Sequence, residues 1–268
     1  MWRTMPLHIG TCGFSYRDWV GPFYPPGIKS LDMLPFYAEQ FGCVEIDSTY
    51  YAIPKPRLFE SMDQRTPPSF RFAVKAPGSI THLPADTSPD PQEAASFRSS
   101  LEPISAAGKL GAVLAQFPHS FRPGREGYRR LEWLRDQWPD LNLIAEFRHR
   151  AWQGDETLAN LRSLNIGWCN VDEPRFASLM RPGSEVTSNV GYVRFHGRNY
   201  GKWWKQERAA HERYDYLYTS EELTEWVPRI AAVDEQAKET YVFFNNHHLG
   251  KAARNARELA ATLRSGRP

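Results

Sequence analysis

The chain has 268 residues and nearly balanced charge, with 33 Lys and Arg against 31 Asp and Glu and a formal net charge of +2. This balance excludes a protein that coats a polyanion, and an aromatic content of 13% is too high for a disordered chain. The length allows one large hydrophobic core or two smaller ones. The composition therefore indicates a folded globular protein whose number of domains is still open.

The N-terminal residues and the cysteines predict a cytoplasmic protein. Residues 1–8 lack the apolar stretch of ~7–15 residues that marks a secretory signal, and no segment approaches the ~20 apolar residues of a membrane helix. Cys12, Cys43 and Cys169 are widely spaced and form no Cys-x-x-Cys pair, which argues against a disulfide framework and against a cysteine-only zinc site. We therefore expect a protein that does not bind membranes.

Eight short apolar or β-branched segments, each bounded by turn residues, predict β-strands. They are Leu7–Gly10, Cys43–Asp47, Phe70–Lys75, Gly111–Phe117, Leu141–Phe147, Ile166–Val171, Gly191–His196 and Thr240–Asn245. Helical periodicity falls between them, at Leu31–Phe41, Arg57–Arg65, Gln92–Ala107, Gly127–Trp138, Asp155–Leu164, Ser220–Ala237 and Leu249–Arg264. The interval after the sixth strand, Asp172–Thr187, is the exception, because its sequence allows no more than a short helix.

This alternation of strand and helix predicts a single (β/α)8 TIM barrel over residues 1–268. The repeats have a mean length of roughly 33 residues and no composition break separates them. A doubly wound open sheet is the structural alternative. It is disfavoured because no Gly-x-Gly-x-x-Gly turn is present.

In such a barrel the site lies where the strands end, and every predicted strand here ends in polar residues. Residues two apart share a face, so Glu146 and Arg148 are expected to point inward, as are Arg194 and His196. The expected inward set mixes acids with bases, which must be paired or solvated. Its members are Glu45, Asp47, Glu146, Asp172, Lys75, Arg148, Arg194 and His196. The polar rim residues are Asp47, Lys75, Gln116, Glu146, Arg148, Asp172, Arg194, His196, Arg198 and Asn245.

Motifs along most of the chain resemble the YecE-like family, labelled domain of unknown function 72. They include Gly10-Thr11-Cys12-Gly13-Phe14, Glu45-Ile46-Asp47-Ser48-Thr49-Tyr50-Tyr51, Gln116-Phe117-Pro118, Glu146-Phe147-Arg148-His149, Arg194-Phe195-His196-Gly197 and Asn245-Asn246-His247. The resemblance implies a TIM barrel but no reaction, although similarity to nucleases of the AP-endonuclease type has been suggested for the family. Cys12 stands where Ser is common, and Asp47 where Asn is common.

The rim residues fit metal-free acid and base chemistry better than a metal site. Asp47, Glu146, Asp172 and His196 are possible ligands of a divalent metal, but Lys75 and Arg148 among them would repel the ion. We therefore predict no metal ligand and no identified cofactor. Glu146, His196 and Asp172 are the expected catalytic residues. The expected ligand-binding residues are Asp47, Tyr51, Lys75, Gln116, Arg148, Trp152, Arg194, Arg198 and Asn245.

Aromatic residues in the rim loops allow a second hypothesis. Residues 198–205 interleave bases with Tyr200, Trp203 and Trp204, and Tyr16, Tyr50 and Trp152 follow other strands. Aromatic faces beside cations can stack nucleobases of single-stranded nucleic acid, although the same rings can simply pack the loops onto the barrel. The sequence thus predicts an enzyme, of hydrolase or lyase type, for a phosphorylated or otherwise anionic ligand. The alternative is a nucleic-acid-binding protein.

Overall fold

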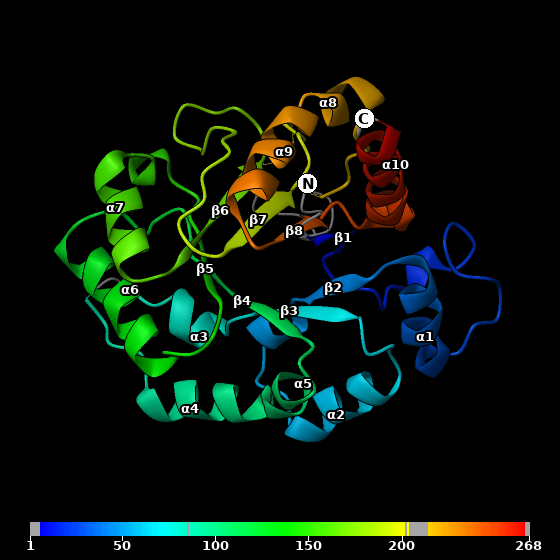
Figure 1. Cartoon of the computed structure of the whole chain (residues 1–268), viewed down its shortest axis with the longest axis horizontal. Helices are drawn as coiled ribbons and strands as arrows, with labels where there is room; N and C mark the ends of the chain where they lie inside the picture. The colour runs from blue at the N-terminus through cyan, green and yellow to red at the C-terminus, as the bar shows by residue number, and fades with distance from the viewer. Residues whose placement is uncertain (1–5, 85, 202, 204–213, 266–268) are drawn as a thin grey trace.

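In the computed structural model, which describes residues 6–84, 86–201, 203 and 214–265, eight parallel strands are surrounded by helices (Figure 1). This confirms the predicted TIM barrel. The strands are β1 (Leu7–Thr11), β2 (Cys43–Ile46), β3 (Arg71–Lys75), β4 (Leu110–Gln116), β5 (Leu143–Glu146), β6 (Gly167–Asp172), β7 (Val190–Phe195) and β8 (Glu239–Phe244).

Hydrogen bonds join the strands in the order β1-β8-β7-β6-β5-β4-β3-β2, and β1 closes onto β2. A parallel bridge between Cys12 and Glu45 makes this closure, and the backbone N–H of Gly13 donates to the carbonyl of Glu45 at 2.7 Å. The two strands approach so closely that a Cβ at Gly10 would lie 2.4 Å from the carbonyl oxygen of Cys43. Gly10 is therefore required where the barrel closes.

The helices occupy the intervals between strands, and α2, α4 and α5 pack beside one another along one side of the barrel (Figure 1). The α-helices are α1 (Ser30–Gln40), α2 (Pro56–Gln64), α3 (Gly78–Thr81), α4 (Pro91–Ser100), α5 (Glu102–Ala106), α6 (Arg125–Gln137), α7 (Asp155–Ser163), α8 (Ser220–Thr224), α9 (Val227–Gln236) and α10 (Lys251–Ser265). Short 3-10 turns are η1 (Arg17–Trp19), η2 (Ser48–Tyr50), η3 (Arg150–Trp152) and η5 (His248–Gly250).

Two of the predicted helices are each divided in the structure. The predicted Gln92–Ala107 consists of α4 and α5, and the predicted Ser220–Ala237 consists of α8 and α9. Pro103 and Pro228 stand in the first turns of the second helices, where proline is favoured because it lacks the N–H group that a residue in a helix interior uses. After β6, residues 173–189 contain no helix, so even the short helix that we allowed there is absent.

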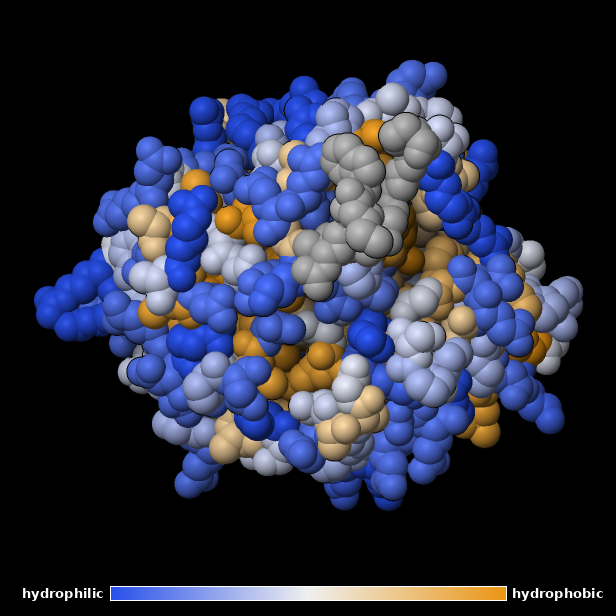
Figure 2. Space-filling model, viewed as in Figure 1, coloured by the Kyte–Doolittle hydropathy of each residue, from blue (hydrophilic) through white to orange (hydrophobic). Residues whose placement is uncertain are grey.

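Most of the apolar core lies between the strands and the helices. The inside of the barrel mixes polar side chains with apolar ones such as Phe243, which packs against Tyr192. On the outer face, Phe147 stacks on Trp152 at 4.3 Å between ring centres, and Phe195 stacks on Phe244 at 4.5 Å. Figure 2 shows a mostly hydrophilic surface, with hydrophobic residues visible mainly toward the middle of the face in view. Within the described part of the chain, no helix is long and apolar enough to cross a membrane.

Candidate functional site

The inner faces of β2, β5 and β7 meet in a buried ion cluster centred on Arg194. Its Nη2 lies 2.7 Å from Oε1 of Glu45, and its Nη1 lies 2.5 Å from Oε2 of Glu146. The hydroxyl of Tyr192 donates to Oε2 of Glu45 at 2.7 Å. All four side chains are at most 2% exposed. Two carboxylates already neutralise Arg194, so this predicted ligand-binding residue is engaged inside the protein.

The second oxygen of Glu146 joins this cluster to Arg148, one step closer to the rim. Oε1 of Glu146 lies 2.8 Å from Nε of Arg148, whose side chain is 12% exposed. Burial opposes ionisation of Glu146, but Arg148, Arg194 and His196 outweigh it and hold the pKa of Glu146 well below its ordinary value. Glu146 is therefore a fixed anion whose two oxygens both face cations or imidazole.

His196 is held on both ring nitrogens beneath the rim. Its Nε2 lies 3.2 Å from Oε1 of Glu146, and its Nδ1 lies 3.1 Å from the side-chain nitrogen of Asn245. Because that amide nitrogen can only donate, Nδ1 accepts and Nε2 carries the hydrogen that faces Glu146. Burial, followed by the charge of Arg148, lowers the pKa of His196 to about 3. The structure thus brings the predicted pair Glu146 and His196 together, as a neutral imidazole on a fixed carboxylate.

Asp172 lies on the opposite face of its strand, so its expected inward placement is wrong. Its carboxylate accepts from Nε of Arg198 at 2.9 Å and faces Tyr218 and Trp226. Arg198 also lies 3.0 Å from Glu225 at the end of α8. Strand β6 turns its even-numbered residues toward the helices, which separates Asp172 and Arg198 from Glu146 and His196. Their contacts attach the segment after β7 to the helices outside the barrel.

Glu173, which sequence reasoning missed, takes the inward position after β6. Its Oε2 accepts from Nη1 of Arg148 at 3.0 Å, and its Oε1 accepts from the backbone N–H of Met180 at 3.1 Å. Burial raises the pKa of Glu173 to about 7, although the charge of Arg148 opposes the rise. Alternation from the inward Cys169 would have found it, because residues 169, 171 and 173 share one face.

Asp47, Lys75 and Arg148 form what we call the mouth of the barrel, above the Arg194 cluster. Asp47 and Lys75 are partly exposed, and neither makes an ion pair or side-chain hydrogen bond with any residue that the structure describes. Burial and the charge of Glu45 raise the pKa of Asp47. Burial, then the charge of Arg194, lowers the pKa of Lys75 to about 8. Within the described part of the chain, the mouth therefore offers one carboxylate and one amine that are not paired with an opposite charge.

Aromatic and imidazole rings border the mouth beside Lys75. The ammonium of Lys75 lies 4.4 Å from the ring centre of Tyr50, and that ring packs edge-on against His82 at 4.9 Å. Burial, then the charge of Lys75, lowers the pKa of His82 to about 4, so this ring is neutral. Sequence reasoning did not single out His82, which lies on the segment after β3 where no periodic signal places its side chain.

The other predicted ligand-binding residues lie apart from Lys75 or make contacts of their own. Trp152 is fully buried on the outer side, where its indole N–H donates to the carbonyl of Phe121 at 2.9 Å. Gln116 is buried and donates to the carbonyl of Phe117 at 2.7 Å. Tyr51 is 84% exposed. The alternative hypothesis of nucleobase stacking rested on the segment 198–205. Of this segment, Lys202 and residues 204–205 lie outside the described residues, and Trp203 is buried.

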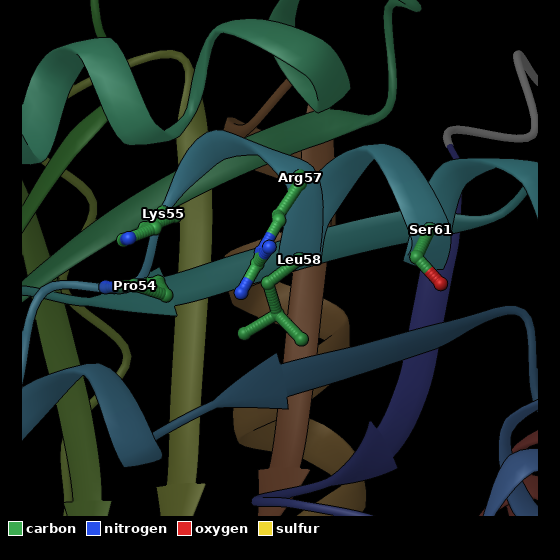
Figure 3. A pocket seen from close by; sticks show the side chains of 5 residues that line it. All are labelled: Pro54, Lys55, Arg57, Leu58 and Ser61. Carbon is green, nitrogen blue, oxygen red and sulfur yellow. The ribbon is translucent and has the colours of Figure 1, made fainter.

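Two further features bear on where a ligand can bind. Among the described residues, no group of three or more His, Cys, Asp or Glu side chains is arranged to hold a metal ion. A surface hollow lies along the start of α2, outside the strands (Figure 3). Pro54, Lys55, Arg57, Leu58 and Ser61 line it, and none of them is a predicted site residue. The mouth thus remains the place where the predicted residues converge.

Comparison with known proteins confirms the resemblance drawn from the motifs. A family model described as "Protein of unknown function DUF72" matches residues 8–268. The UPF0759 protein YunF of Bacillus subtilis (strain 168) is 32% identical over 273 residues, which cover 96% of this chain and 94% of YunF. The UPF0759 protein YecE of Escherichia coli (strain K12) is 31% identical over 184 residues, covering 67% of this chain and 64% of YecE. A crystal structure of a DUF72 family protein from Thermotoga maritima MSB8 matches with a TM-score of 0.89 and 40% identity, covering 97% of this chain and 99% of that one.

Proposed function

The chain belongs to the DUF72 family of proteins of unknown function, and we propose that it is an enzyme, of hydrolase or lyase type, that acts on a small phosphorylated or otherwise anionic ligand at the mouth of the barrel. The observation that carries this proposal is the state of Lys75. Its ammonium is partly withdrawn from water and meets no carboxylate within ion-pair distance among the described residues. An unpaired cation in such a place is costly unless a ligand supplies the opposite charge.

Arg148 gives the anion a second point of attachment. Its Nε faces Glu146 and its Nη1 faces Glu173, while its Nη2 makes no hydrogen bond with a described residue. Two carboxylates thus hold the guanidinium in one orientation and leave one donor for a ligand oxygen. A phosphate or carboxylate can accept from Nη2 of Arg148 and from Lys75 together.

Asp47 supports a role in proton transfer. Its carboxylate stands at the mouth without a side-chain partner among the described residues, and its raised pKa brings it closer to neutral pH than an ordinary aspartate. Asp47 can then take a proton from a bound ligand while Lys75 gives one. Glu146 and His196, which we predicted as acid and base, are better placed to position Arg148, because the contacts between them and with Asn245 occupy their polar atoms.

Binding of inorganic phosphate tests the proposal. Titration calorimetry on the wild type is expected to show one site, and Lys75→Ala is expected to weaken it about tenfold or more, since one charged hydrogen bond contributes about 1.5–3 kcal/mol. Lys238→Ala is the matched control, because Lys238 is exposed and precedes β8 at the opposite end of the barrel. Equal affinities of Lys75→Ala and the wild type, or no binding by the wild type, would contradict the proposed site.

A further inference from the structure

We propose that Lys75 is a nucleophile that forms an imine with the carbonyl group of its ligand, so that the ligand class is small anionic aldehydes or ketones. The inference rests on the proposed function, because it assigns chemistry to the same mouth. Imine formation needs an amine that is fixed in place, partly neutral and close to a group that handles protons. The surroundings of Lys75 meet these three conditions.

The backbone of Lys75 is fixed by both neighbouring segments. Lys75 is the last residue of β3 and pairs with Leu114 of β4. The hydroxyl of Thr49 donates to its carbonyl oxygen at 2.5 Å. Residues two apart share a face, so Lys75 points the same way as the fully buried Ala73. The side chain therefore starts from rigid backbone and enters the mouth, where Arg148 can hold the anionic group of the ligand while the amine of Lys75 meets its carbonyl group.

The charges around Lys75 favour its neutral form, and a second lysine of the same chain shows the contrast. Arg148 and Arg194 both repel the ammonium of Lys75, and Glu45 and Glu146, which attract it, are already bound to arginines. Lys109 is also buried, but its Nζ lies 2.6 Å from Asp63 and donates to the backbone carbonyl of Thr66 at 2.9 Å. Lys109 thus has a carboxylate and a backbone carbonyl as partners, whereas Lys75 has neither for its side chain among the residues that the structure describes.

The proton balance at Lys75 follows from its electrostatic surroundings. With burial as the main cause, the pKa of Lys75 is lowered to about 8. About a tenth of the amine is then neutral at pH 7, whereas an ordinary lysine is almost entirely charged. The ring of Tyr50, 4.4 Å from Nζ, gives the cationic iminium product an aromatic face in place of a carboxylate.

The reaction needs no oxidant or reductant. The neutral amine of Lys75 attacks the carbonyl carbon, and the carbonyl oxygen takes up the proton that the nitrogen loses, which gives a carbinolamine. Asp47, which first takes the proton that the ammonium of Lys75 gives up, then donates it to the hydroxyl, which leaves as water while the nitrogen lone pair forms the C=N bond. The iminium can accept electrons from an adjacent C–H or C–C bond, which suits a lyase.

Reductive trapping with glyoxylate and sodium cyanoborohydride tests this step on the full-length wild type. Glyoxylate carries an aldehyde and a carboxylate, and the hydride of the reagent converts an imine into a stable carboxymethyl-lysine. Peptide mapping by mass spectrometry is expected to find Lys75 modified at least about tenfold faster than the exposed Lys29 and Lys238, in keeping with its larger neutral fraction. Glycolaldehyde, which lacks the carboxylate, is expected to show a smaller preference for Lys75, because only the neutral fraction of the amine then favours this residue. Inorganic phosphate is expected to reduce the preference shown by glyoxylate.

The two proposals can fail separately. Modification of Lys75 no faster than of Lys238, in protein that binds phosphate through Lys75, overturns the imine and leaves the anion site standing. Selective modification of Lys75 by glycolaldehyde and glyoxylate alike, without protection by phosphate, overturns the assignment to anionic carbonyl ligands. Both readouts compare lysines within one wild-type sample, so they do not depend on the folding of a variant.

Discussion

Glu146 lies between Arg194 and Arg148, with Oε2 at 2.5 Å from Nη1 of Arg194 and Oε1 at 2.8 Å from Nε of Arg148. This one carboxylate joins the closed interior of the barrel to the mouth, because Arg194 is 2% exposed and Arg148 is 12% exposed. The arrangement couples the stability of the barrel to the position of the proposed anion-binding arginine.

Loss of the Glu146 carboxylate is expected to destabilise the protein strongly. Glu146→Ala leaves two guanidinium groups short of an anion in a buried place, at a cost of about 3–5 kcal/mol in the free energy of unfolding. Glu146→Gln keeps the volume and a hydrogen-bond acceptor, so its loss is expected to be smaller. Urea denaturation of the three proteins measures both effects. A cost below about 1 kcal/mol for Glu146→Ala would contradict the coupling.

Asp172 is expected to matter for stability and not for the ligand. Its carboxylate meets Arg198 on the outer face of the barrel, so Asp172→Asn is expected to cost about 1–3 kcal/mol in the free energy of unfolding. Its affinity for phosphate is expected to equal that of the wild type. A folded Asp172→Asn variant that no longer binds phosphate would show that Asp172 acts at the mouth after all.

The raised pKa of Glu173 predicts how the free energy of unfolding depends on pH. Its pKa is about 7 in the folded protein and near its ordinary value of 4.5 when unfolded, so the folded state holds the extra proton between these values. Stability relative to Glu173→Gln is therefore highest at low pH and falls as the pH rises through about 7, by up to about 3 kcal/mol. Chemical denaturation of both proteins from pH 5 to pH 8 gives the difference. A constant difference over that range would mean that Glu173 is ionised throughout.

The lowered pKa of Lys75 predicts that the affinity for sulfate falls in alkaline solution. Sulfate keeps its charge over the range, whereas the ammonium of Lys75 is lost as the pH rises through about 8. His82 and His196 are neutral throughout, and Arg148 and Arg194 stay charged, so they do not produce this change. Lys75→Arg is expected to keep its affinity to higher pH, because a guanidinium does not titrate there. Calorimetric titrations at pH 7 and pH 9 test this, and the same pH profile for both proteins would argue against Lys75 as the ligand cation.

The fold could be predicted from the sequence because short apolar segments mark the strands and apolar residues at helical spacing mark the helices. Each of the eight strands begins and ends within two residues of its predicted segment. Alternation also placed Glu146, Arg148, Arg194 and His196 on the inner face. The helix breaks near Leu101 and Trp226 were missed, because the apolar period continues across both. Prolines just beyond each break were the only local signal.

The site was harder to predict, because the predicted sixth strand ended at Val171 and its alternation was not extended to the two residues that follow. Asp172 was placed inward and its neighbour Glu173 was overlooked, although only one of two adjacent residues can face the interior. Alternation also cannot report distance. It could not show that Arg194 is neutralised from both sides while Lys75 meets no carboxylate in the ranges that the structure describes. Those differences arise from contacts between strands far apart in the sequence.

The location of a bound anion tests the central claim most directly. Crystals of the wild type soaked with tungstate, an electron-dense analogue of phosphate, are expected to show the anion between Nζ of Lys75 and Nη2 of Arg148, with Asp47 nearby. An ordered tungstate bound only elsewhere, such as at Lys55 and Arg57 beside α2, with ordered solvent alone at the mouth, would contradict the account.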